Sequence, residues 1–98
     1  MSKHIIFRRA AKDEFDAATI WYEERQAGLG SRFVAEVDKA VELAANDPTR
    51  FPIKHDVIRC VQVRRFPYSI YYLDEPNRIV VLAVFHARRN PVIWQSRT

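Results

Sequence analysis

The sequence has little cysteine and glycine and no long hydrophobic run. Of its 98 residues one is cysteine and two are glycine, and no stretch approaches the roughly 18 consecutive apolar residues of a membrane-spanning helix. The lone Cys60 forms neither an internal disulfide nor a zinc-ligand cluster, which agrees with a reducing compartment. Residues 1–10 are polar and basic and lack the apolar core of a secretory signal. We therefore expect a cytoplasmic protein that does not associate with a membrane.

Motifs that hold a cofactor, a metal ion or a nucleophile are also absent from the sequence. It has no phosphate-binding loop, no glycine-rich dinucleotide turn, no His and Cys residues at metal-ligand spacing and no Ser-His-Asp signature. We therefore expect no cofactor and no metal site. With 48% hydrophobic residues the chain has enough apolar surface to fold, but its length does not suffice for two hydrophobic cores. We expect a single domain that spans residues 1–98.

Positive charge is concentrated in the C-terminal half of the chain. Residues 1–49 contain 7 Lys and Arg against 9 Asp and Glu, whereas residues 50–98 contain 9 against 3. This asymmetry indicates an acidic partner, which is nucleic acid, an acidic protein segment or both. Solvated surface arginine explains the same composition, so charge alone leaves the function open.

The apolar spacing of the first half predicts two amphipathic helices. Residues 10–25, and a second segment that ends near Asn46, place apolar side chains three and four positions apart. Residues 26–30, which include both glycines, interrupt the pattern. The first stripe consists of Ala11, Phe15, Ala18 and Tyr22, and the second of Phe33, Val37, Ala40, Val41 and Ala44. Because the connection is short, we expect the two helices to pack as an antiparallel hairpin.

The remaining segments predict a sheet that the helix hairpin covers on one face. The predicted strands span residues 4–8, 58–65, 68–73 and 78–85, with a connecting loop over residues 51–57. The last strand is apolar without alternation, which is typical of a central strand covered on both faces. The C-terminal segment 87–98, a partner chain or both must therefore cover the second face. The order β-α-α-β-β-β predicts an α+β domain with a mainly antiparallel sheet.

Basic residues gather at the ends of the predicted strands. They are Arg59, Arg64 and Arg65 before the Phe66-Pro67 corner, and His86, Arg88 and Arg89 after the central strand. If the strands pair, several of these cations meet near one edge of the sheet. His86 with nearby arginines could then act on a phosphodiester without a metal ion. The sequence places no second acid or base for such cleavage, so a structural role for His86 and contact with a partner both stay open.

Most of the other aromatic and acidic side chains are expected to be structural. Tyr68, Tyr71 and Tyr72 could stack on bases, but alternation along their strand places at least one set in the core. We expect Trp21 and Trp94 to be buried anchors. The acidic pairs that we expect to be solvated are Asp13-Glu14 and Glu23-Glu24.

Two C-terminal segments and several parts of the helix hairpin region contain motifs that occur together in a known protein family. The C-terminal segments are Arg64–Tyr72 and Ile79–Pro91, followed by Trp94. The parts of the hairpin region are Trp21–Arg25, Gly28–Gly30, Arg32-Phe33, Glu36-Val37, Pro48 and Arg50–Pro52. Together they span nearly the whole chain, and the chain resembles the ParE/RelE superfamily of type II toxin-antitoxin toxins. The hairpin region is similar to the ParE branch.

The resemblance implies a fold, a function and a set of partners. The fold would be RelE/ParE-like, and the chain would be the toxin of a type II toxin-antitoxin system, neutralised by a ParD-like or similar antitoxin. The ParE branch is associated with inhibition of DNA gyrase. On this reading the residues that bind the target would be Arg64, Arg65, His86, Arg88, Arg89 and Trp94.

Two other functions stay open at this stage. A RelE-type, ribosome-dependent mRNA endoribonuclease would use His86 with Arg64, Arg65 and Arg88. The tail of the chain, however, has Trp94 where RelE-like toxins carry a reactive tyrosine or histidine, and neither indole nor arginine can act as the base. A non-toxic module that keeps only antitoxin binding is the third possibility. We therefore favour the ParE reading, in which no residue is catalytic.

Overall fold

The computed structural model describes residues 2–98 and confirms the predicted α+β class. The order of elements is β1 (His4–Phe7), α1 (Arg9–Arg25), α2 (Leu29–Asn46), the short 3-10 helix η1 (Pro48–Arg50), β2 (Ile53–His55), β3 (Ile58–Gln62), β4 (Tyr68–Glu75), β5 (Arg78–His86) and α3 (Val92–Gln95). The prediction of a loop over residues 51–57 was wrong, because three of these residues pair with β3 as an edge strand. Among residues 2–98, none of the helices combines the length and the hydropathy that a membrane span requires.

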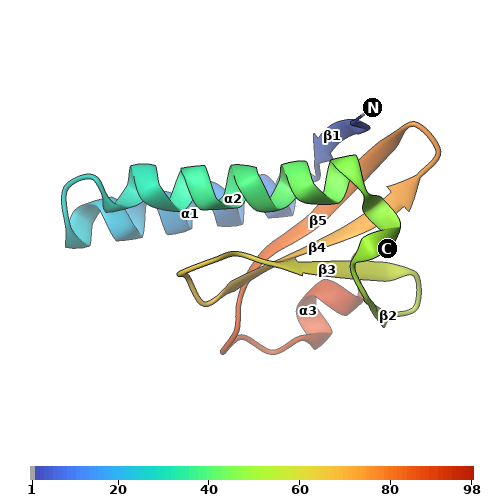
Figure 1. Ribbon diagram of the computed structural model, residues 1–98. Helices are drawn as coiled ribbons and strands as arrows, with labels where there is room; N and C mark the ends of the chain where they lie inside the picture. The colour runs from blue at the N-terminus through green and yellow to red at the C-terminus, as the bar shows by residue number, and fades with distance from the viewer. Residues whose placement is uncertain (1) are drawn as a thin grey trace.

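The five strands form one sheet in the order β1-β5-β4-β3-β2. β1 pairs in parallel with β5, and all other neighbours are antiparallel. The antiparallel helix hairpin of α1 and α2 lies on one face of the sheet, and α3 lies on the other (Figure 1). The predicted hairpin and the mainly antiparallel sheet are therefore confirmed.

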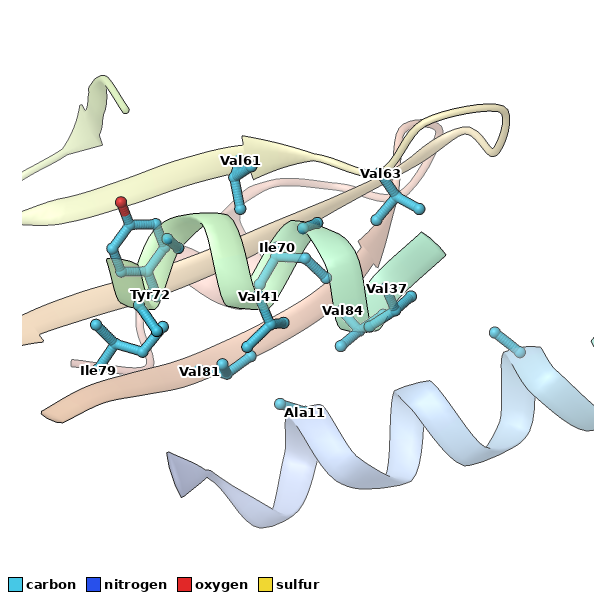
Figure 2. Packing of buried hydrophobic residues seen from close by; sticks show 14 of the residues in the cluster. Ala11, Val37, Val41, Val61, Val63, Ile70, Tyr72, Ile79, Val81 and Val84 are labelled. Carbon is cyan, nitrogen blue, oxygen red and sulfur yellow. The ribbon is translucent and has the colours of Figure 1, made fainter. Parts of the chain in front are cut away.

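Two hydrophobic cores share the sheet. On the hairpin side, Ala11 of α1 and Val37 and Val41 of α2 point toward Val81 and other buried strand residues (Figure 2). On the other side Trp94 of α3 is 3% exposed and stacks on Tyr71, with 3.8 Å between the ring centroids. β5 is buried from Ile79 to Phe85, as its apolar composition predicted, and the C-terminal segment supplies the second cover.

An irregularity in β5 reverses the side on which its last residues lie. Tyr71 pairs with Ala83 but the next residue, Tyr72, pairs with Val81, so β5 has one extra residue in the form of a β-bulge. Before the bulge Val81 faces the hairpin, and after it Val84 does. Because side chains alternate along a strand, the bulge also brings His86, two residues beyond Val84, to the hairpin side.

The two glycines have different roles in the turn between the helices. Gly28 precedes α2 with φ of 86°, a conformation that side chains disfavour. Gly30 lies inside α2 where a Cβ atom would come within 2.8 Å of the Thr19 carbonyl oxygen, so it allows the helices to approach. The carboxylate of Glu23 accepts hydrogen bonds from the N–H groups of both glycines, at 2.9 and 3.0 Å. Glu23 is exposed, as predicted for the pair Glu23-Glu24, but its carboxylate also caps the N-terminus of α2. The sequence analysis did not predict this capping role.

Candidate functional site

The predicted meeting of basic residues at one end of the sheet is confirmed. Tyr68, at the start of β4, pairs with His86 at the end of β5, and the Ala87 N–H donates to the Pro67 carbonyl at 2.9 Å. The β3–β4 turn and the chain that follows β5 therefore lie side by side. We call the group at this end the basic rim, which consists of Arg64, Arg65, His86, Arg88 and Arg89. Arg59 lies elsewhere, and its guanidinium donates to the Phe51 carbonyl at 2.7 Å, which is a structural contact.

Three arginines of the basic rim are open to a partner. Arg64, Arg65 and Arg88 are exposed, and within residues 2–98 their guanidinium groups have no hydrogen bond or ion pair. Arginine carries its charge at all physiological pH values and presents a planar fork of donors that matches carboxylates and phosphates. These three side chains are therefore suited to bind an anionic surface.

Arg89 belongs to an ion-pair network that closes the edge of β5. Its Nη1 atom lies 2.6 Å from Oε2 of Glu14, and its guanidinium lies 4.3 Å from the centre of the Phe85 ring. Arg97 also binds Glu14, with Nη1 at 2.9 Å from Oε1, and it donates to the Leu82 carbonyl at 3.1 Å. Oε1 of Glu14 in turn accepts the Val84 N–H at 3.1 Å. Arg89 is thus partly neutralised within the chain.

The prediction that Glu14 is solvated was wrong, and the sheet topology explains why. β1 ends at Phe7, opposite Val81, so no strand formed by residues 2–98 neighbours the edge of β5 beyond that point. Glu14 and Arg97 take the N–H of Val84 and the carbonyl of Leu82 that a longer β1 would have bound. The side chain of Glu14 is 13% exposed. An α1 carboxylate and a C-terminal guanidinium therefore replace part of a strand.

His86 lines a cavity of about 530 Å³ between α1 and the end of the sheet. Its ring lies edge-on to Tyr68, with centroids 5.2 Å apart, and its Nδ1 accepts the Arg88 N–H at 3.0 Å. The other ionisable groups lining the cavity are Glu14, Tyr22 and Tyr68. Glu14 is held by two arginines, and burial raises the pKa of both tyrosines. The cavity thus offers His86 no ready partner for acid–base catalysis.

Comparison with known proteins assigns the chain to a family. The family model that describes the ParE toxin of the type II toxin-antitoxin system parDE matches residues 5–91. The chain belongs to the ParE toxin family. Its fold is similar to that of a chain from the chromosomal ParDE TA system of P. aeruginosa, with a TM-score of 0.74 and 16% sequence identity over 89% of this chain and 98% of that chain. A search of curated proteins found no match.

The two tryptophans of this ParE-family chain differ in exposure. Trp94 is buried against Tyr71, as expected of an anchor, and a partner cannot reach its indole while α3 stays in place. The prediction that Trp21 is buried was wrong, because the residue is 50% exposed, and the guanidinium of Arg25 lies 4.1 Å from the centre of its ring. Tyr68 and Tyr72 face the hairpin and Tyr71 faces α3, so both sets of tyrosines pack against a core.

The sequence analysis did not predict that Glu14 pairs with Arg89 of the basic rim, although the position of Glu14 in the first helix indicated that it is buried. Glu14 lies three residues after Ala11 and four before Ala18, both of which are buried. Residues at these spacings share one face of a helix. A carboxylate on a buried stripe needs partners, and the basic C-terminal half could supply them.

No group of three or more His, Cys, Asp and Glu side chains among residues 2–98 is arranged to hold a metal ion.

Proposed function

We propose that this chain is a toxin that inhibits DNA gyrase and is neutralised by a cognate antitoxin of the ParD type. The match of the ParE toxin family over residues 5–91 carries the proposal. We place its action in the cytoplasm, where gyrase and its DNA substrate are found. The similarity of the fold to a chain from a ParDE TA system supports an antitoxin as the partner of this chain.

The basic rim supports binding of the target rather than catalysis. Arg64, Arg65 and Arg88 are exposed, and their charges are not paired within residues 2–98. His86 keeps only its Nε2 atom for a partner, because the backbone of Arg88 occupies Nδ1. We assign the whole rim to the contact with gyrase. Trp94, which the resemblance also implied, is left out because it is buried.

A supercoiling assay with purified toxin and gyrase tests this proposal. The wild-type protein is expected to inhibit supercoiling. Arg88→Ala is expected to weaken inhibition without loss of folding, because the Arg88 guanidinium has no partner within residues 2–98. Arg78→Ala is the matched control, since Arg78 is also an exposed arginine but lies on β5 at the end of the strand opposite the basic rim, where it pairs with Glu75 at 2.6 Å. Full gyrase activity in the presence of wild-type toxin would reject the proposal.

Expression in bacterial cells separates the other two functions. Growth is expected to stop when the toxin is induced alone and to recover when the antitoxin is produced with it. Normal growth without the antitoxin would instead identify a non-toxic binding module. Rapid loss of translated mRNA that His86→Ala abolishes would identify a ribonuclease, which the surroundings of His86 do not favour.

A further inference from the structure

Arg65 of the basic rim has a backbone conformation that arginine rarely adopts. Its φ is +69°, and the only other non-glycine residue among 2–98 with a positive φ is Asp56, at +55°. Aspartate tolerates the left-handed region because its short side chain bonds locally, whereas arginine gains no such contact. An asparagine or glycine would suit position 65 better. Such outliers concentrate where a side chain serves a function.

The surroundings of Arg65 impose this conformation. The ring of Phe66 packs against Tyr22 and Phe33, with centroid distances of 4.8 and 5.1 Å. The Val63 N–H donates to the Tyr68 carbonyl at 2.9 Å and closes the turn. Because both sides of the turn are fixed, the chain at residue 65 cannot relax. The turn therefore presents the exposed side chain of Arg65 at the corner of the sheet.

Arg65 also lines a cleft that is separate from the cavity at His86. The cleft lies between α2 and the β3–β4 turn and has a volume of about 320 Å³. Its lining residues are Leu29, Arg32, Ala35, Glu36 and Lys39 of α2, with Arg65 and Phe66 of the turn. The α2 residues recur every three or four positions and so form one stripe of the helix.

The charges of the cleft favour an anionic occupant. Three cations, from Arg32, Lys39 and Arg65, surround a single carboxylate, that of Glu36, which already lies 3.9 Å from Nζ of Lys39. The apolar side chains of Leu29, Ala35 and Phe66 line the same space. Cationic walls beside apolar side chains fit an acidic polypeptide segment that carries an apolar residue better than they fit a phosphodiester backbone.

We propose that this cleft binds an acidic segment of the antitoxin, with one of its carboxylates on Arg65. The inference rests on the proposed function and specifies how the toxin is neutralised. The small volume admits side chains of an unfolded or helical segment rather than the surface of a folded domain. Since Arg65 belongs to both the cleft and the basic rim, the bound segment removes a cation from the surface that meets gyrase. Neutralisation is then direct competition at this residue.

Binding and inhibition measured in parallel test the cleft. The probe is the purified product of the reading frame that adjoins the toxin gene, titrated against full-length toxin by calorimetry. Arg32→Ala and Lys39→Ala are each expected to weaken its binding by about tenfold, as for close charge pairs in protein interfaces, and to leave gyrase inhibition unchanged. Arg88→Ala is expected to do the reverse. Wild-type affinity in the Arg32→Ala, Lys39→Ala double variant would overturn the inference.

Arg65→Asn tests the competition itself. It is expected to raise the midpoint of thermal unfolding, because asparagine tolerates the left-handed backbone, and to weaken both antitoxin binding and gyrase inhibition. Asp56→Asn is the matched control at the other positive φ, and it should change neither function. If Arg65→Asn keeps full antitoxin affinity, the assignment of Arg65 fails. If wild-type toxin does not inhibit gyrase, the proposed function fails, while the effects of Arg32→Ala and Lys39→Ala on antitoxin affinity still decide on the cleft.

Discussion

The carboxylate of Glu14 lies where a longer β1 would continue, and it joins three separate parts of the chain. It accepts the N–H of Val84 in β5 and binds the guanidinium groups of Arg89 and Arg97. Both arginines come from the segment that carries α3. The anchoring of the C-terminal segment and the edge of the sheet therefore depend on one α1 side chain.

Glu14→Ala is expected to lower the free energy of unfolding by about 2 to 3 kcal/mol, because it leaves a buried N–H and the mostly buried Arg97 without their acceptor. Asp13→Ala, at the exposed neighbouring position, should stay within about 0.5 kcal/mol of the wild type. Urea denaturation of the two variants measures the difference. Equal stability of both would show that the network contributes nothing.

Arg88 and Arg89 are neighbours in sequence but should differ in their effect on stability. Arg89 pairs with Glu14 and lies over Phe85, so Arg89→Ala is expected to cost about 1 kcal/mol of unfolding free energy. Arg88→Ala is expected to cost nothing measurable. Urea denaturation checks both, and a loss of stability in Arg88→Ala would mean that the effect of this variant on gyrase is not specific to binding.

Tyr72 makes the stability of the protein depend on pH in the alkaline range. Burial raises the pKa of its phenol from 10.0 to about 12, and its hydroxyl donates to the Pro48 carbonyl at 2.6 Å. The unfolded chain loses this proton near pH 10 and the folded chain only near pH 12, so the contribution is complete below pH 10 and is lost between the two values. Urea denaturation at a series of pH values should show this loss in the wild type and a smaller one in Tyr72→Phe.

At the scale of elements, the sequence predicted those that have a strong period or an apolar core. The first helix was expected over residues 10–25 and spans Arg9–Arg25. β2 was missed because it is three residues long, exposed throughout and preceded by Pro52. The bulge in β5 was missed for another reason. Its extra residue, Leu82, lies in a run that is apolar on both faces of the sheet. The sequence therefore does not show where the residues of β5 switch from one face to the other.

Helix α3 is too short to be stable alone, and Trp94 is the side chain that it buries against the sheet. Trp94→Ala removes the stack on Tyr71 and is expected to cost about 3 to 5 kcal/mol of unfolding free energy. Trp21→Ala is the control, since that ring is half-exposed on α1 and should cost less than about 1 kcal/mol. Guanidinium denaturation followed by circular dichroism measures both. A small effect of Trp94→Ala would mean that other contacts hold α3 in place.

At the scale of the whole molecule, the sequence predicted where the basic rim lies but not which of its charges are free. Its location follows from antiparallel pairing, which brings the end of β5 beside the start of β4. The pairing of Arg89 with Glu14 joins residues 75 positions apart. Such a contact depends on the angle between α1 and the sheet and on the length of β1, and local sequence patterns record neither.

The two cores lie on opposite faces of one sheet and share β5, so we expect them to unfold together. In Trp21→Phe the only remaining indole is Trp94, whose fluorescence reports on the core beneath α3, while far-ultraviolet circular dichroism is dominated by α1 and α2 on the other face. The two signals should give the same urea midpoint and slope, as two-state unfolding of a small domain requires. A fluorescence transition at lower urea would mean that the C-terminal segment detaches from an intact hairpin and sheet. The network of Glu14 with Arg89 and Arg97 opposes that separation, so Glu14→Ala in the same background is expected to move the fluorescence midpoint at least as far as the circular dichroism midpoint.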